Sequence, residues 1–273
     1  MASVPRLSRA QLSATWRGPL DVPRTPLDRR TLQRETWLVL GVSLGASAIY
    51  AVLSIMRRLA DNRPLNQQAS QLNVSQAAQA WLDLLYQLAD IALALVPVLL
   101  VFHLLRREMP SPASYLGLDR SRLKPDIALG AGLAALVGIP GLGLYLVARA
   151  AGLNTQVVAS DLGDHWWSLP ILVLSAVQNA VLEEVIMIGY LFTRWTQAGW
   201  RLPQILIVSA LIRGSYHLYQ GFGGFVGNIA MGLLLGLVYA RTRRVLPLVI
   251  THALLDTVAF VGYALLHNHV SWL

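Results

Sequence analysis

The 273-residue sequence contains no cysteine, and only 13% of its residues are charged. Without cysteine the chain has no disulfide, no thiolate nucleophile and no cysteine-ligated metal. Hydrophobic residues make up 55% of the chain, and the mean hydropathy is +0.52. A soluble domain of this size could not bury so much apolar surface. The composition therefore predicts an integral membrane protein.

Lysine is almost absent, and Lys124 is the single example. The net charge of +8 comes from arginines, which stand in the N-terminal tail and at the ends of apolar runs. In these places they set membrane orientation, so we expect no nucleic-acid partner. The excess of arginine over lysine favours a bacterial source, and with it the bacterial plasma membrane as the location.

Seven apolar runs have about the length, ~20 residues, that crosses ~30 Å of hydrocarbon as a helix. They cover residues 37–56, 84–105, 127–148, 169–195, 203–221, 222–240 and 246–266. The sequence thus predicts an all-α polytopic transmembrane bundle of about seven spans. Arginines concentrate in the connections on one side, which the positive-inside rule makes cytoplasmic together with the N-terminus.

The predicted organisation has three parts. Residues 1–36 form a polar, basic and partly disordered cytoplasmic tail, without the apolar segment of a signal peptide. Residues 37–160 hold three transmembrane helices and their loops. Residues 161–273 form a core of about four helices, and this core carries the candidate site.

Ionisable residues inside the predicted spans are the candidate functional groups. A charge near the bilayer centre costs at least ~2.5 to 3.5 kcal/mol on insertion scales, so it is kept where it has a partner or faces a cavity. At a rise of ~1.5 Å per residue, groups on the fourth, fifth and seventh spans reach similar depths and are expected to converge. They are Asn179, Glu183, Glu184, Arg213, His217, His252 and Asp256. Asn179 lies one turn before Glu183, so we expect it to orient the Glu183 carboxylate.

These groups suit peptide hydrolysis, which needs an activated water, a base and donors to the developing oxyanion. Glu183 with His217 can supply the base and the activated water. Zinc is the competing account, because two histidines and several carboxylates could ligate it. The sequence has no HExxH motif and no two histidines four residues apart, so we expect no metal and no other cofactor.

Three further residues lie near these groups in the predicted spans. Tyr216, Tyr219 and Asn228 are candidates to line the same cavity. Gly232 and Gly236 are four residues apart, a spacing that indicates close helix packing rather than chemistry.

The motifs resemble those of the CPBP (Abi) family, which includes type II CAAX prenyl endopeptidases and bacteriocin-processing or self-immunity proteins. That family shows Glu-Glu-x-x-x-Arg, Phe-x-x-x-His and His-x-x-x-Asn/Asp motifs on neighbouring transmembrane helices. The matching residues here, in the same order, are Glu183-Glu184, His217, and His252 with Asp256. The resemblance covers about residues 165–266.

The resemblance implies a CPBP-type intramembrane glutamic endopeptidase, of a kind also classed as a metalloprotease, acting on a membrane-associated peptide or protein among membrane lipids. Glu183 would be the general base and His217 its partner in activating a water. His252 and Asp256 would bind the scissile carbonyl. Asp256 stands where the prenyl proteases commonly have asparagine, so it would have to be protonated or orient His252 instead. Glu184 would be a supporting residue.

Two positions depart from the family motifs. Ile188 replaces the expected arginine, and Arg213 replaces the expected phenylalanine. We therefore predict that Arg213, on the facing helix, neutralises Glu184. A catalytically silent scaffold or immunity protein of the same fold is the main alternative function. A proton-coupled transporter is a weaker one, because the sequence shows no inverted repeat.

Overall fold

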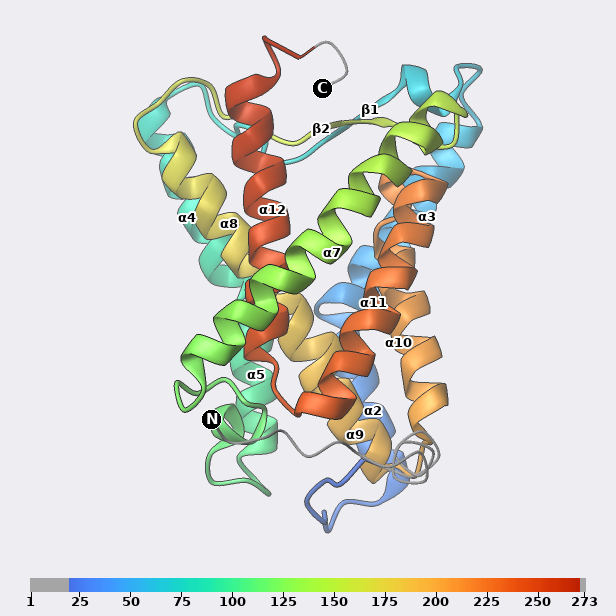
Figure 1. Ribbon diagram of the computed structural model, residues 1–273, viewed down its shortest axis with the longest axis vertical. Coiled ribbons are helices and arrows are strands. Elements are labelled where there is room, and N and C mark those ends of the chain that lie inside the picture. Colours follow the sequence, from blue (N-terminus) through green and yellow to red (C-terminus); the bar gives the residue numbers. More distant parts are fainter. Residues whose placement is uncertain (1–19, 271–273) are drawn as a thin grey trace.

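The structure is a computed structural model, and it describes residues 20–270 of the chain. Helices that run roughly along the long axis dominate it (Figure 1), which confirms the all-α prediction. The α-helices are α2 (Arg29–Gly41), α3 (Leu44–Leu59), α4 (Ala80–Ala94), α5 (Val96–Leu105), α6 (Pro112–Tyr115), α7 (Leu123–Ala150), α8 (Ser168–Glu183), α9 (Leu191–Gln197), α10 (Leu202–Tyr216), α11 (Phe222–Thr242) and α12 (Leu246–Leu266). The remaining elements are the 3-10 helices η1 (Leu65–Gln67) and η3 (Leu218–Gln220), the π-helix η2 (Glu184–Tyr190), and the strands β1 (Ala69–Gln71) and β2 (Gln156–Val158).

The long helices differ in their capacity to span a bilayer. Within residues 20–270, five helical segments are long and apolar enough to cross a membrane, or six if α2 and α3, bent by 55°, form one span. The fifth predicted span corresponds to α10, a shorter apolar helix of 15 residues. The predicted count of seven is therefore not confirmed, and the cytoplasmic side of the N-terminus stays a prediction.

The N-terminal segment differs from the expected tail. α2 begins at Arg29, inside the range 1–36 that was predicted to be tail. The Asp28 carboxylate caps this helix by accepting a 2.8 Å hydrogen bond from the backbone N–H of Thr31. Ahead of the helix, the carbonyl of Pro23 accepts a 3.0 Å hydrogen bond from Gln197 of α9. The prediction for residues 1–19 lies outside the described residues.

A short parallel sheet ties two loops together at the end of the bundle where α3 and α7 finish (Figure 1). β1 pairs with β2, and next to β2 an isolated bridge joins Asn154 to Gly221. Gly221 has φ 111°, and a Cβ there would lie 2.5 Å from the carbonyl oxygen of Leu153, so only glycine fits. This bridge holds the turn between α10 and α11 close to the candidate site.

The segment α8–η2–α9 is the central helix of the bundle. In an apolar stretch of 18 residues in this segment, 67% of the residues are buried inside the protein. The matching stretches of the other candidate spans are 11–28% buried. α12 packs against α8 and α7, and α10 packs against α11 and α3. A Cβ on Gly236 of α11 would lie 2.6 Å from Leu206 of α10, which confirms close packing at the glycine pair. Helices α8, α10 and α12 therefore carry the candidate residues toward one another.

Candidate active site

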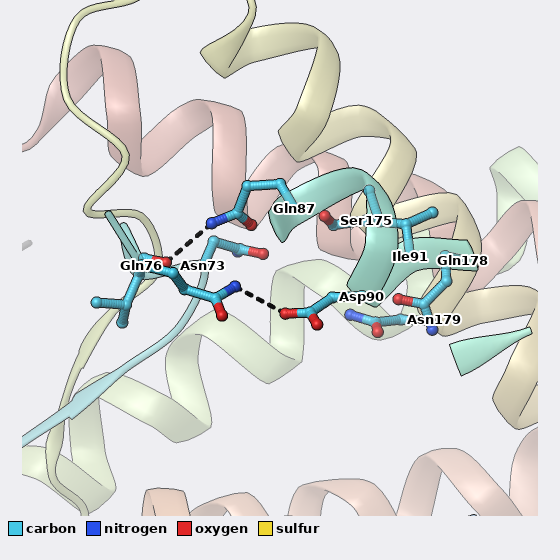
Figure 2. A pocket seen from close by; sticks show the side chains of 9 residues that line it. Asn73, Gln76, Gln87, Asp90, Ile91, Ser175, Gln178 and Asn179 are labelled. Carbon is cyan, nitrogen blue, oxygen red and sulfur yellow. Dashed lines mark hydrogen bonds between the residues drawn. The ribbon is translucent and has the colours of Figure 1, made fainter. Parts of the chain in front are cut away.

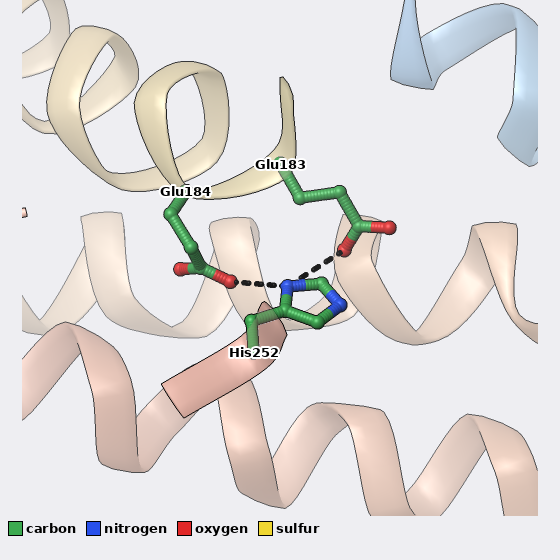
Figure 3. Close-up of side chains that lie close together, drawn as sticks. All are labelled: Glu183, Glu184 and His252. Carbon is green, nitrogen blue, oxygen red and sulfur yellow. Dashed lines mark hydrogen bonds and ion pairs between the residues drawn. The ribbon is translucent and has the colours of Figure 1, made fainter. Parts of the chain in front are cut away.

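The two adjacent glutamates stand where α8 passes into the π-helix η2. Glu183 is the last residue of α8, and Glu184 is the first residue of η2. Both are buried, and both carboxylates turn toward His252 (Figure 3). π-Helical turns are rare and are frequent at functional sites. No local pattern marks this π-helix, because its residues continue the apolar run of an ordinary helix.

His252 on α12 lies between three carboxylates. Its Nδ1 is 2.9 Å from Oε1 of Glu184 and 3.9 Å from Oε2 of Glu183 (Figure 3). Its Nε2 is 3.6 Å from Oδ2 of Asp256, one turn further along the same helix. This geometry matches the second of the two roles considered for Asp256, in which it orients the imidazole.

Arg213 supplies the positive charge next to the two glutamates. Its side chain is buried and forms an ion pair with Oε1 of Glu184, and its Nη1 is 3.7 Å from Oε2 of Glu183. Gly232 of α11 leaves room for it, since a Cβ there would lie 3.1 Å from Cδ of Arg213. The predicted pairing of Arg213 with Glu184 is therefore present, and it sets an arginine against the glutamate pair although residue 188 is isoleucine.

Tyr216 and His217 approach the site from the end of α10. The Tyr216 hydroxyl donates a 2.7 Å hydrogen bond to Oε2 of Glu183. Nδ1 of His217 is 3.0 Å from the carbonyl oxygen of Arg213, which can only accept, so Nδ1 carries the proton and Nε2 stays free. Within residues 20–270, His217 and Glu183 form no direct hydrogen bond. Their predicted partnership therefore needs a water between them.

Asn179 takes a different partner from the one expected. The sequence predicted that it orients the carboxylate of Glu183, one turn away on α8. In the structure its amide donates to Oδ2 of Asp256 at 3.5 Å, because it faces α12, while Glu183 turns toward α10 and Tyr216. Asn179 thus remains at the site, but it contacts Asp256 and not Glu183.

Two of the three extra lining candidates have local partners. The hydroxyl of Tyr219 accepts a 2.8 Å hydrogen bond from Gln220, and Asn228 donates to the carbonyl of Gly224 in its own helix. Of these candidates, Tyr216 is the one that contacts the glutamate pair. Sequence spacing alone could not separate it from the others.

The site has unused hydrogen-bonding capacity. Oε2 of Glu184 and Nη1 of Arg213 are buried without a hydrogen bond to any described residue. Oε1 of Glu183 likewise accepts none from residues 20–270, since its hydrogen bond and its ion pairs all involve Oε2. Buried polar atoms are normally satisfied, so these atoms point to a water or a substrate group in the site.

A metal ion is a second possible occupant. One ligand atom each from Glu183, Glu184 and His252 lies within 4.8 Å of the others, and this donor set suits zinc (Figure 3). The Glu184 oxygen nearest His252 is already paired with Arg213, however. A divalent ion would have to displace or lie beside that guanidinium, which disfavours the metal.

Comparison with known proteins gives one family match. Residues 165–258, about a third of the chain, match the model of Rce1-like type II CAAX prenyl endopeptidases. The match confirms the resemblance to the CPBP family, and it contains Glu183, His217, His252 and Asp256. No curated protein and no solved structure matches the chain. Together with the apolar helices, the family match supports an integral membrane protein of the intramembrane protease class.

Proposed function

Starting from this family match, we propose that the protein is an intramembrane glutamic endopeptidase with Glu183 as its general base. The observation that carries the proposal is the position of the Glu183 carboxylate. Its Oε2 is fixed by Tyr216 at 2.7 Å, while Oε1 is free to take the proton of a water. A general base must lie within hydrogen-bond reach of that proton, and a fixed carboxylate with one free oxygen meets this requirement.

The remaining groups have roles in the same reaction. Glu183 removes a proton from water, and the hydroxide attacks the carbonyl carbon of the peptide bond. His217 positions this water through its free Nε2. Glu183 then passes the proton to the leaving nitrogen as the C–N bond breaks, so a carboxylic acid and an amine are released.

His252 is the proposed donor to the oxyanion. Its Nδ1 is engaged by Glu184, so the proton on Nε2 is the one that can reach the carbonyl oxygen. Both ring nitrogens then carry protons, which is the imidazolium form. Asp256, at 3.6 Å, orients the ring, and Asn179 holds Asp256.

The substrate, surroundings and cofactor also belong to the proposal. We propose cleavage of a membrane-associated peptide or protein in the bacterial plasma membrane, with lipid around the bundle and no nucleic-acid partner. We propose no cofactor, because the Arg213 guanidinium, paired with Glu184, places a positive charge beside the position that a metal ion would take. The family motif has an arginine at the position of Ile188. Arg213 supplies a positive charge to Glu184 in its place, which weakens the case for a catalytically silent scaffold.

The test is cleavage of a quenched membrane-peptide library by the purified protein. We expect Glu183→Gln to lower the rate about 10³-fold, within the range of general-base catalysis, and to leave folding intact. Glu35→Gln is the matched control, because the side chains of Glu35 and Glu183 are 12% and 11% exposed. It should cleave within about twofold of wild type, as expected for a residue outside the reaction.

Two other outcomes would change the assignment. Loss of cleavage on adding a chelator, with recovery on adding zinc, would replace the water-only mechanism with a metal site at Glu183, Glu184 and His252. If neither wild type nor Glu183→Gln cleaves any peptide of the library, the peptidase proposal is overturned and the scaffold function is favoured.

A further inference from the structure

A polar cavity of about 300 Å³ lies between α8, α4 and the loop before α4 (Figure 2). Of its lining residues, the proposed reaction uses Asn179, which contacts Asp256. Five amide side chains dominate the lining: Asn73, Gln76, Gln87, Gln178 and Asn179. A volume near 300 Å³ is at the lower limit of ligand pockets, enough for two or three side chains of a peptide.

Two buried side chains in this cavity lack partners. Ser175 and Gln178 of α8 are each 8% exposed, and neither makes a hydrogen bond to any residue in the described part of the chain. Gln87, by contrast, donates to the carbonyl of Val74 at 3.0 Å and to Asp83 at 3.2 Å. The polar groups of Ser175 and Gln178 are therefore available to a ligand in the cavity.

Asp90 provides the charge of the cavity. Its Oδ2 accepts a 2.7 Å hydrogen bond from Gln76 (Figure 2), and its other oxygen accepts none from the described residues. No arginine, lysine or histidine is part of the lining. A carboxylate without a cationic partner in this lining attracts a positively charged group and repels a negative one.

The cavity is connected to the candidate active site through α8. Asn179 lines the cavity and also donates to Asp256 at 3.5 Å. Gln178 precedes Glu183 by five residues, which is ~7.5 Å along the helix. An extended peptide advances ~3.3 Å per residue, so two or three residues span this distance.

We propose that this cavity is a substrate subsite for a polar peptide segment two or three residues from the scissile bond, with Asp90 binding a lysine or arginine side chain. Gln178 and Asn179 take the peptide backbone, because an amide side chain donates and accepts hydrogen bonds as a peptide bond does. The proposal rests on the peptidase function and adds a substrate class to it.

The test uses the full-length protein in lipid nanodiscs and three labelled peptides. Each has the same apolar segment, followed by a polar segment that carries lysine, glutamine or glutamate. Binding is measured by fluorescence anisotropy on Glu183→Gln, which does not cleave, and cleavage is measured on the active protein. Asp90→Asn should raise Kd and KM for the lysine peptide about tenfold, leave kcat within about twofold, and leave the glutamine peptide unaffected.

The variants Gln178→Leu and Asp164→Asn complete the design. Gln178→Leu should weaken binding of all three peptides, because it removes a backbone contact. Asp164→Asn is the matched control, since Asp164 is an exposed carboxylate just before α8 that does not line the cavity. It should change no affinity.

The proposal is overturned if Glu183→Gln binds the three peptides equally, or if Asp164→Asn matches the effect of Asp90→Asn. Its failure is distinguishable from failure of the peptidase function. If wild type cleaves nothing but the lysine peptide binds in an Asp90-dependent way, the cavity is a peptide site in a protein that does not hydrolyse.

Discussion

The two most deeply buried arginines, Arg194 and Arg213, stand in similar settings but have different neighbours. Their side chains are 0% and 1% exposed, and each lies against two glutamates. Arg194 is on α9 at one end of the central helix, and Arg213 faces the middle of that helix from α10. Charge and burial alone therefore do not separate the two clusters.

The Arg194 cluster is closed by its own contacts. Nη1 of Arg194 donates to both carboxylate oxygens of Glu108, at 2.7 and 2.9 Å, and Nη2 donates to the carbonyl of Leu104. Gln197 donates to the same carboxylate at 2.8 Å and also to the carbonyl of Pro23. Such a cluster joins α9 to the end of α5 and to the N-terminal segment, which is a structural role.

The Arg213 cluster differs from the Arg194 cluster in its imidazoles. His252 contacts Glu184, and Oε1 of Glu183 has no described donor. Missing hydrogen bonds alone are not diagnostic, because in the Arg194 cluster Oε2 of Glu35 and Nε of Arg194 also lack one. What distinguishes the Arg213 cluster is a carboxylate fixed by Tyr216 and lying beside imidazoles, which can donate and accept protons.

Arg194→Met tests whether the Arg194 cluster is only structural, and it has the largest expected effect. Removing the guanidinium leaves the Glu108 carboxylate buried without a cation, so we expect the free energy of unfolding to fall by about 3 to 5 kcal/mol. Cleavage per folded molecule should stay within about twofold of wild type. Unfolding in mixed micelles and cleavage of the peptide library measure the two quantities separately.

Arg120→Met is the control for this prediction. Arg120 is exposed, so its replacement should change the free energy of unfolding by no more than about 0.5 kcal/mol. If Arg194→Met abolishes cleavage while the protein stays as stable as wild type, the Arg194 cluster belongs to the chemistry and the comparison is wrong.

A double-mutant cycle on Arg213→Met and Glu184→Gln sharpens the comparison. Each single change removes the paired opposite charge from a buried group, so the double variant should be more stable than the two single losses predict. We expect a coupling free energy of about 1 to 3 kcal/mol from the unfolding of the four proteins. Cleavage should not return in the double variant, because Arg213 also lies 3.7 Å from Glu183. Simple additivity would mean that the ion pair contributes nothing to folding.

The helices could be predicted from apolar runs, because a helix that crosses the membrane needs about 20 consecutive apolar residues and such a run is visible in the sequence. The run at 246–266 coincides with α12, and the run at 127–148 lies within α7. The start of α2 was missed, because its first turns are polar and hydropathy marks the membrane-embedded part of a helix, not its end. The three-residue strands β1 and β2 depend on pairing across the fold and have no local signal.

The members of the candidate site could also be predicted, but not their contacts. Buried charge is costly, so ionisable residues within apolar runs had to meet. The choice of partner depends on side-chain rotamers and on helix rotation, which spacing does not determine. For this reason Asn179 was expected at Glu183 but contacts Asp256, and the hydrogen bond from Tyr216 to Glu183 was not foreseen.

The smallest effect is expected for Tyr216→Phe in the Arg213 cluster, compared with the same change at a tyrosine beside Arg194. Tyr216→Phe removes the 2.7 Å hydrogen bond that fixes Glu183, so kcat should fall roughly tenfold, ~1.4 kcal/mol, with KM unchanged. Tyr190→Phe is the matched control, because Tyr190 is buried beside Arg194 and its hydroxyl has no described partner. Its kcat should stay within about twofold of wild type. Equal losses in both variants would show that kcat responds to general loosening of the central helix, and the hydrogen bond to the base would then have no special part in the reaction.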